Sequence, residues 1–301
     1  MRLRGTATGL IATALLVSAC SGPATPNAAR TTSASTDPPP AAAPVATATP
    51  ANGPTTPPGP TGPPPPAGTV DRYIYDLPRF GPAPLPLVIS PPPATGPAQQ
   101  LNQIPVGDQR VAFITIDDGY TKDPDILKIM RAVHLPFTMF LTTNAIKSDP
   151  AFFASLVQAG GVIEDHTVSH PQLIHLTYEQ QRREICDNRD TLTTLFGRAP
   201  TIMRAPYGLA NADTLAAAAS CGIRVNVFWN EYPVTGPVEY QRPGGIHPGD
   251  MVLMHFDQYL KANLMSTLQA FQRDGITPAL MEDYLGQPPL VPTNIPPEPI
   301  V

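Results

Sequence analysis

The run Arg110-Val111-Ala112-Phe113-Ile114-Thr115-Ile116 passes directly into Asp117-Asp118-Gly119. β-Branched, aliphatic and aromatic side chains dominate the run, which is typical of a strand buried in a sheet. The two aspartates and the glycine indicate that the strand ends where they begin. We therefore predict a buried strand that carries Asp117 and Asp118 at its carboxyl end.

Helices and strands alternate after this strand. Helical spacing of apolar residues, with capping residues at the ends, predicts helices at 124–133, 149–159, 177–196, 211–220 and 258–273. Short apolar runs predict strands at 137–141, 162–164, 201–203, 223–229, 250–255 and 276–278. Regular alternation indicates an α/β fold with a parallel sheet, and the number of units favours a closed or nearly closed barrel.

Polar residues directly follow several of these strands. The carboxyl ends of parallel strands meet at one face of such a fold, and active sites are found there. We therefore expect one site to be formed by Asp117, Asp118, His166, His170, Arg204 and His255.

Asp118, His166 and His170 are the candidate metal ligands. The two histidines are four residues apart, which is one turn if the segment is helical, so both imidazoles can bind one cation. One carboxylate and two imidazoles fit either a hydrolytic zinc centre or an Fe(II) oxygenase centre. The alternating pattern favours hydrolysis, because these oxygenases usually have double-stranded β scaffolds.

The other polar residues indicate how hydrolysis would proceed. With Asp118 on the metal, Asp117 is free to take a proton from metal-bound water. Arg204 is placed to orient Asp117, and His255 is placed to donate a proton to the leaving group. No chemistry is expected of the remaining histidines, which lie beside prolines or in loops: His134, His175 and His247.

The N-terminus has the features of an export signal. Arg2 and Arg4 precede an apolar stretch too short to span a bilayer comfortably, and small residues follow it. Val17-Ser18-Ala19-Cys20 resembles a bacterial lipobox, which makes Cys20 the expected lipidation site and residues 1–20 a signal peptide. The alternative is an ordinary signal peptide with an incidental cysteine. Lipidation would anchor the chain to the outer face of the cytoplasmic membrane.

Composition divides the rest of the chain. Residues 21–100 hold 23 of the 41 prolines and are expected to form a disordered linker that acts as a tether. Residues 101–286 are the expected catalytic domain and 287–301 a Pro-rich tail. From residue 101 onward, 14 basic residues against 21 acidic ones give a net charge of −7. This charge excludes the basic surface that a nucleic-acid-binding protein needs.

Cys186 and Cys221 are the remaining cysteines. In an exported protein an isolated pair is more often bonded than free, so we predict a disulfide. The alternative is two buried free thiols.

Four ordered segments of the chain resemble the polysaccharide deacetylase family, also called carbohydrate esterase family 4, with its NodB-homology domain. The family's T-F-D-D-G, H-[ST]-x-x-H, R-x-P-Y and L-x-H correspond to residues 115–119, 166–170, 204–207 and 253–255. The resemblance covers about residues 110–285. It implies a distorted (β/α) barrel of about seven units and metal-dependent removal of acetyl groups from a polysaccharide.

The resemblance also assigns roles to single residues. Asp118, His166 and His170 would bind a divalent metal, Zn²⁺ first and Co²⁺ or Mn²⁺ as alternatives. Asp117 would be the base, Arg204 would orient it, and His255 would be the general acid. The backbone N–H of Tyr207 would help the metal to stabilise the oxyanion of the reaction. Pro206 and Leu253 would contact the substrate, Leu253 at the acetyl group.

One segment departs from the family. The usual D-x-x-D-W is absent, and Trp229-Asn230-Glu231-Tyr232 stands in that region. We expect Glu231 to partner His255 in place of the missing aspartate, and Trp229 to form part of the sugar-binding wall. In addition, Asp165 replaces the Asn that commonly precedes the first metal-binding histidine.

The sequence thus predicts an exported enzyme that removes N-acetyl groups from an N-acetylhexosamine polymer, with peptidoglycan or a chitin-like glycan as substrate. Two alternatives stay open. One is an O-acetyl esterase of the xylan type. The other is a glycan-binding protein without activity, against which Asp117 and His255 argue because binding needs neither a base nor an acid.

Overall fold

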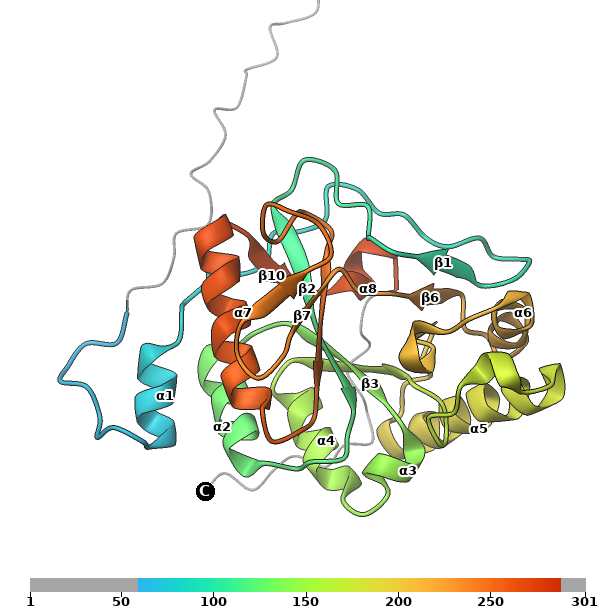
Figure 1. The fold of residues 1–301 in the computed structure, drawn as a ribbon, viewed down its shortest axis with the longest axis horizontal. Coiled ribbons are helices and arrows are strands. Elements are labelled where there is room, and N and C mark those ends of the chain that lie inside the picture. Colours follow the sequence, from blue (N-terminus) through green and yellow to red (C-terminus); the bar gives the residue numbers. More distant parts are fainter. Residues whose placement is uncertain (1–58, 288–301) are drawn as a thin grey trace, which may run out of the picture. The chain divides into compact units, whose positions relative to one another are not determined.

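The computed structural model describes residues 59–287, in which one sheet organises the fold (Figure 1). Within this part, ten strands run in the order β1-β6-β5-β4-β3-β2-β9-β7-β8, with β10 paired to β2. Only the β7–β8 pair is antiparallel. The strands are β1 (Gln99–Leu101), β2 (Val111–Asp118), β3 (Phe137–Leu141), β4 (Gly161–Asp165), β5 (Ile202–Met203), β6 (Val225–Val227), β7 (Glu231–Pro233), β8 (Val238–Tyr240), β9 (Met251–His255) and β10 (Thr277–Ala279).

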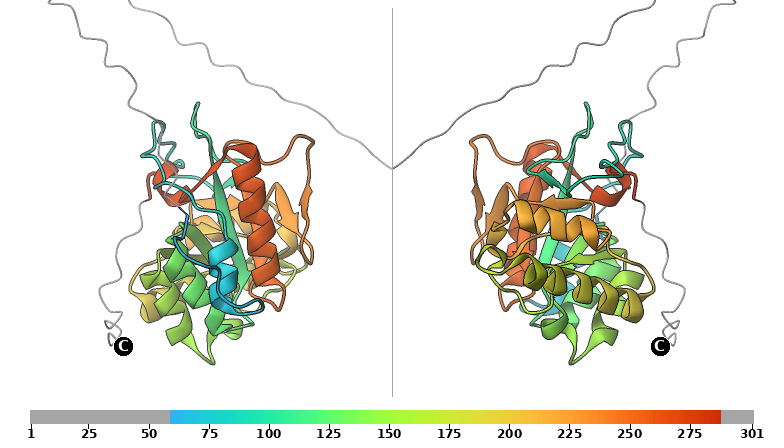
Figure 2. Two further views of the ribbon diagram at one scale, coloured as in Figure 1. Left: turned by 90° about the vertical axis from the view of Figure 1, so that its left-hand side faces the viewer. Right: turned by 90° about the vertical axis from the view of Figure 1, so that its right-hand side faces the viewer.

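Helices cover the sheet from two sides (Figure 2). α1 and α7 lie side by side on one side, and α5 and α6 lie on the opposite side. The helices are α1 (Val70–Asp76), α2 (Pro124–Val133), α3 (Thr143–Ile146), α4 (Pro150–Gln158), α5 (Tyr178–Phe196), α6 (Ala212–Ser220), α7 (Leu260–Asp274) and α8 (Met281–Tyr284). The structure confirms the predicted α/β architecture, a (β/α)-type barrel whose chain of strand pairs begins at β1 and ends at β8.

Strand β2 lies inside the sheet and is buried on both faces. Its Ala112, Ile114 and Ile116 point to the face of the sheet that the helices cover, which we call the outer face, and belong to the core there. Val111 and Phe113 belong to a second core on the inner face. Successive side chains of a strand point to opposite faces, so Thr115 and Asp117 continue the inner face. This alternation decides which candidate site residues of the strand point to the inner face.

The prediction of a disordered linker is wrong for residues 59–100. Helix α1 begins after Thr69, whose Oγ1 accepts a hydrogen bond from the N–H of Arg72, and its residues Val70, Tyr73 and Ile74 pack against the outer core. Strand β1 then pairs with β6. Residues 59–100 therefore belong to the folded unit, because apolar side chains scattered among the prolines find the core to pack on.

The loop between α1 and β1 is fastened by hydrogen bonds. Gln109 accepts from the N–H of Leu87 at 2.7 Å and donates to the carbonyl of Leu85 at 2.8 Å. Arg224 donates to the carbonyl of Pro93 at 2.6 Å. Such side-chain contacts replace the ladder bonds that proline-rich backbone cannot make.

The predicted disulfide is present between Cys186 and Cys221, whose Cα atoms are 5.0 Å apart. It joins the middle of α5 to the end of α6. The signal peptide, Cys20 and residues 288–301 of the tail lie outside the described residues. Among residues 59–287, no helix combines the length and hydropathy that crossing a bilayer requires.

Candidate metal-dependent hydrolase site

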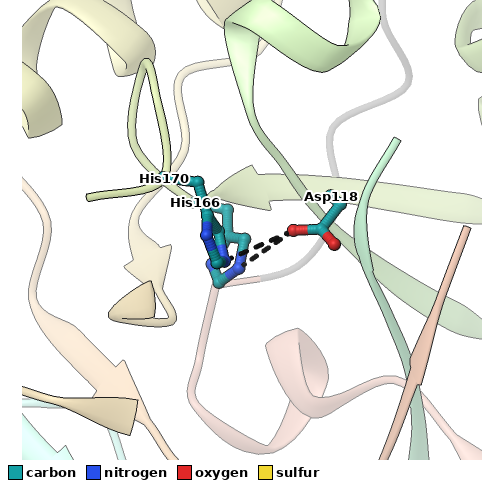
Figure 3. A group of neighbouring side chains, drawn as sticks. All are labelled: Asp118, His166 and His170. Atoms are coloured by element: carbon teal, nitrogen blue, oxygen red, sulfur yellow. Dashed lines mark ion pairs between the residues drawn. The ribbon is translucent and has the colours of Figure 1, made fainter. Parts of the chain in front are cut away.

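The three predicted metal ligands converge at the carboxyl ends of β2 and β4 (Figure 3). Asp118 Oδ1 lies 3.4 Å from His170 Nε2 and 3.6 Å from His166 Nε2. Asp118 Oδ1 is buried and has no hydrogen-bond partner among the described residues. An unpaired buried carboxylate oxygen facing two imidazole nitrogens is costly unless a cation joins them, so these residues fit a divalent metal.

Left-handed backbone at three positions brings these ligands together. Asp118 has a φ of 76°, Thr167 of 69° and His170 of 59°. The turn at Asp118 ends β2, so its side chain does not continue the alternation of the strand. The segment from His166 to His170 is a loop and not a helix, so the two histidines converge through this backbone and not through one helical turn.

Side chains next to the histidines hold this loop. Asp165 Oδ1 accepts a hydrogen bond from the N–H of Thr167 at 2.9 Å, and Thr167 Oγ1 accepts one from the N–H of His170 at 3.1 Å. Asp165 is fully buried, and this burial raises its pKa to about 8. The aspartate that replaces the usual Asn therefore supports the backbone between the ligands.

His166 is fixed in the form that binds a metal. Its Nδ1 lies 2.7 Å from the carbonyl oxygen of Arg204 and must donate a proton to it, which leaves the lone pair of Nε2 facing Asp118. Burial lowers the pKa of His166 to about 3, against the attraction of the Asp118 charge. The imidazole is therefore neutral at physiological pH.

Asp117 lies beside the ligands with one oxygen engaged and one facing the ligands. Arg204 Nη1 donates to Asp117 Oδ1 at 2.8 Å and to Thr115 Oγ1 at 2.7 Å, and Nη2 donates to the carbonyl of Phe228 at 2.9 Å. Asp117 Oδ2 is 3.6 Å from His166 Nε2. Burial raises the pKa of Asp117, and the charges of Arg204 and His255 oppose this rise. A carboxylate whose pKa is moved toward neutrality suits a general base.

Arg204 is held by the surrounding protein. Its side chain is almost completely buried, and the guanidinium lies 4.5 Å from the centre of the Phe140 ring. Burial lowers the pKa of Arg204, while Asp117 raises it. The structure brings Arg204 to Asp117 as the sequence predicts.

A cleft of about 830 Å³ opens above these groups. Leu253 and His255 reach it from β9, where they point to the inner face together, and Trp229 and Tyr207 also line it. Trp229 stacks on Phe228 with ring centres 4.1 Å apart, while Tyr207 packs its ring against His170. His255 is exposed in the cleft, which a proton donor to substrate requires.

Sequence reasoning missed the far wall of the cleft. That wall comes from the β7–β8 hairpin and from the loop and first turns leading into α7. Val234 and Tyr259 are large, exposed side chains, which is the signal that could have drawn attention to them once the fold was known. The missed lining residues are Tyr232, Pro233, Val234, Thr235, Gln241, Asp257, Tyr259 and Asn263.

The predicted partnership of Glu231 with His255 is wrong. Glu231 is in register with Val252 of β9, and paired residues of neighbouring strands point to the same face. Val252 belongs to the outer core, whereas His255 lines the inner cleft. Burial and the neighbouring carboxylate of Asp250 raise the pKa of Glu231 to about 9. Glu231 thus belongs to a different group of side chains on the opposite face.

Known proteins are similar to this chain in sequence and in fold. The sequence profile described as polysaccharide deacetylase matches residues 105–226. An uncharacterized protein of Streptomyces coelicolor is 34% identical over 186 residues, which span 59% of this chain and 74% of that protein. The chain belongs to the polysaccharide deacetylase family.

Further members are named for their activity. The chitooligosaccharide deacetylase of a Bradyrhizobium species is 29% identical over 188 residues, which span 58% of this chain and 83% of that enzyme. Among solved structures, a family 4 carbohydrate esterase pseudoenzyme from Bacillus anthracis has a TM-score of 0.55 at 17% identity, covering 64% of this chain and 70% of that one. That likeness concerns the fold alone. The activity of this chain is therefore inferred from its site residues.

Proposed function

We propose that this polysaccharide deacetylase-family chain is a metal-dependent enzyme that removes N-acetyl groups from an N-acetylhexosamine polymer. The observation that carries the proposal is the unpaired, buried Oδ1 of Asp118, which faces the Nε2 atoms of His166 and His170. Zn²⁺ is the first candidate, with Co²⁺ or Mn²⁺ as alternatives. When bound there, the cation would polarise the acetyl carbonyl and lower the pKa of a water molecule beside it.

Asp117 supplies the base in this proposal. Arg204 holds its Oδ1, so Oδ2 can accept a proton from the attacking water. The water oxygen then bonds to the carbonyl carbon, and negative charge develops on the carbonyl oxygen. The backbone N–H of Tyr207, next to Pro206 in the turn, donates to that oxygen. A well-placed donor of this kind contributes about 3 to 4 kcal/mol.

His255 completes the reaction. The C–N bond breaks as protonated His255 gives its proton to the departing amine, because an unprotonated amine leaves poorly. The products are acetate and a free amino sugar. Leu253 contacts the acetyl methyl group, while Trp229 and Tyr207 offer flat apolar surfaces to the sugar rings.

The cellular setting forms part of the proposal. An export signal, a lipid anchor at Cys20 and the proline-rich segment after it would place the enzyme outside the cytoplasmic membrane, within reach of the cell wall. Peptidoglycan is then the most accessible polymer with N-acetylhexosamine units. Replacing Cys20 by Ser would release the protein into the medium if this setting is right.

Acetate release from N-acetylglucosamine oligomers by the zinc-loaded full chain tests the activity. Acetylated xylan serves as the competing substrate, and we expect release from the oligomers to be at least tenfold faster. Faster release from xylan would instead identify an O-acetyl esterase. No release from either substrate would leave a glycan-binding protein.

The role of His255 has a sharper test. His255→Ala should slow amide hydrolysis about 100-fold but slow 4-nitrophenyl acetate hydrolysis less than tenfold, because nitrophenolate leaves without a proton. His134→Ala, at the end of α2 and outside the cleft, is the matched control. Equal losses on both substrates would contradict the assignment.

A further inference from the structure

We propose that Glu231, His247 and Asp250 form a second divalent-cation site, separate from the one at Asp118. One ligand atom from each residue lies within 4.8 Å of the others. One imidazole and two carboxylates are a donor set for Zn²⁺ or Mn²⁺. The inference concerns the outer face of β7 and β9 and does not depend on the proposed activity.

Glu231 provides the strongest argument. Its side chain is completely buried, and neither carboxylate oxygen has a hydrogen-bond partner among residues 59–287. A carboxylate removed from water without donors is strongly destabilising, so a proton or a cation must satisfy it. Glu231 lies beside Asp250, which is also acidic, so the two carboxyl groups repel each other when both are ionised and can hydrogen-bond only when one of them carries a proton.

Asp250 is held in the orientation that a ligand needs. Arg242 and the amide of Gln103 donate to its Oδ1, and the backbone N–H of His247 donates to its Oδ2 at 2.7 Å. Each carboxylate oxygen has two lone pairs, so Oδ2 retains one for a cation. The completely buried Asp250 is thus fixed by three donors, as ligating carboxylates usually are.

His247 is brought to the cluster by a tight turn. The N–H of Asp250 bonds to the carbonyl of His247 across His247-Pro248-Gly249-Asp250. Gly249 has a φ of 85°, and a Cβ there would lie 2.3 Å from the carbonyl oxygen of Ile104, so the turn accepts only glycine. His247 Nδ1 lies 3.5 Å from Asp250 Oδ2 and has no hydrogen-bond partner in the described part of the chain.

Either one cation or two protons can satisfy this cluster, and zinc binding separates the two. A proton shared by Glu231 and Asp250 would satisfy the two carboxylates, but a second proton on His247 Nδ1 would be needed to pair it with Asp250 Oδ2, 3.5 Å away. A cation accounts for all three groups. The His247 side chain is 36% exposed, which gives an ion access from solvent and leaves a position for water.

The surrounding charges also favour a cation. Arg242 binds Asp250, and Arg273 binds Asp274, whose Oδ2 accepts from the N–H of Ile246. These two arginines balance two of the three nearby carboxylates, so an ionised Glu231 would have no arginine of its own. A divalent ion supplies the missing positive charge.

Zinc binding to a chain that lacks the first site tests the proposal. In full-length Asp118→Asn/His170→Ala, isothermal titration calorimetry with Zn²⁺ alone should detect one remaining site. Adding His247→Ala or Glu231→Gln should weaken its affinity at least tenfold. Glu239→Gln, an exposed carboxylate on β8 of the same hairpin, is the matched control and should change nothing.

A melting experiment guards against misfolding. Zn²⁺ should raise the Tm of the Asp118→Asn/His170→Ala chain, and the rise should disappear with His247→Ala, whose fold is checked by circular dichroism. If Asp118→Asn/His170→Ala binds no zinc, or if His247→Ala and Glu231→Gln leave its affinity unchanged, the second site does not exist. Neither result would touch the proposed function, whose ligands lie on the inner face.

Discussion

Two layers of charged side chains lie on the inner face of the sheet, and they differ in how their oxygens are paired. In the lower layer, Glu164 accepts one hydrogen bond from Arg198 at 2.6 Å and two from the N–H groups of Thr201 and Ile202 at 2.9 Å. In the upper layer, at the carboxyl ends of β2 and β4, Asp118 Oδ1 accepts none from the described residues. A saturated carboxylate holds the fold together, whereas an unsaturated one beside histidines is available for chemistry.

The same criterion applies to the outer face. The carboxylate oxygens of Glu231 lack hydrogen-bond donors, as Asp118 Oδ1 does, although Glu231 lies on the face of the sheet opposite the cleft. Burial alone does not separate these cases, because Glu164, Asp117 and Glu231 are all buried. The number of hydrogen-bond donors around each carboxylate oxygen separates them.

The largest expected effect concerns stability in the lower layer. Glu164→Gln should lower the free energy of unfolding by about 3 kcal/mol, because it leaves the charge of Arg198 buried without its partner. Urea denaturation measures this loss, and Glu239→Gln is an exposed control. Once folded, the variant should keep its acetate release per bound zinc. A loss of turnover without a loss of stability would reverse the roles of the two layers.

The next effect concerns the upper layer. Arg204→Lys should lower kcat for acetate release about 10- to 100-fold with KM changed less than threefold, because one ammonium group cannot reach Thr115, Asp117 and the Phe228 carbonyl together. Steady-state kinetics on N-acetylglucosamine oligomers provide the measurement. An increase in KM alone would mean that Arg204 binds substrate and does not position the base.

The smallest effect is the pH dependence of the lower layer. Burial raises the pKa of Glu282 to about 8, well above its ordinary value of 4.5, and Thr138 donates to it at 2.8 Å. Between these values the unfolded chain releases a proton that the folded chain keeps, so the contribution of Glu282 to stability falls as pH rises, by about 1.4 kcal/mol per pH unit. Asp165 and Glu231 add to the same slope, because burial raises their pKa values to about 8 and about 9. Glu282→Gln should therefore make the slope shallower by about 1.4 kcal/mol per pH unit, without removing it, in urea denaturation at pH 5, 6 and 7. An unchanged slope would show that another group is responsible.

Much of the site can be predicted from the sequence, because each residue is identified by its position next to a single predicted strand. Asp117, His166, Arg204 and His255 each lie at or just after the end of a parallel strand, and parallel strands bring such ends together whatever their exact order. The disulfide also follows from a simple argument, the pairing of the two cysteines in a chain that is expected to be exported. These inferences need no knowledge of register.

The errors arise where the outcome depends on register or on local backbone. The predicted partnership of Glu231 with His255 is wrong because the direction of the Glu231 side chain depends on how β7 aligns with β9. The left-handed backbone of Thr167 and His170 could not be predicted, because the sequence marks such a conformation only where glycine stands. Helix α1 was hidden because average composition over 80 residues conceals the short pattern of Val70, Tyr73 and Ile74.

Bound zinc and acetate release, measured on the same samples of wild type, Asp117→Asn and Asp118→Asn, test the central claim most directly. We expect Asp117→Asn to bind as much zinc as wild type while its turnover falls about 1000-fold, and Asp118→Asn to lose one equivalent of zinc together with its activity. If Asp118→Asn keeps the full zinc content, or if Asp117→Asn keeps more than a tenth of the wild-type turnover, the division of labour between the two adjacent carboxylates is contradicted.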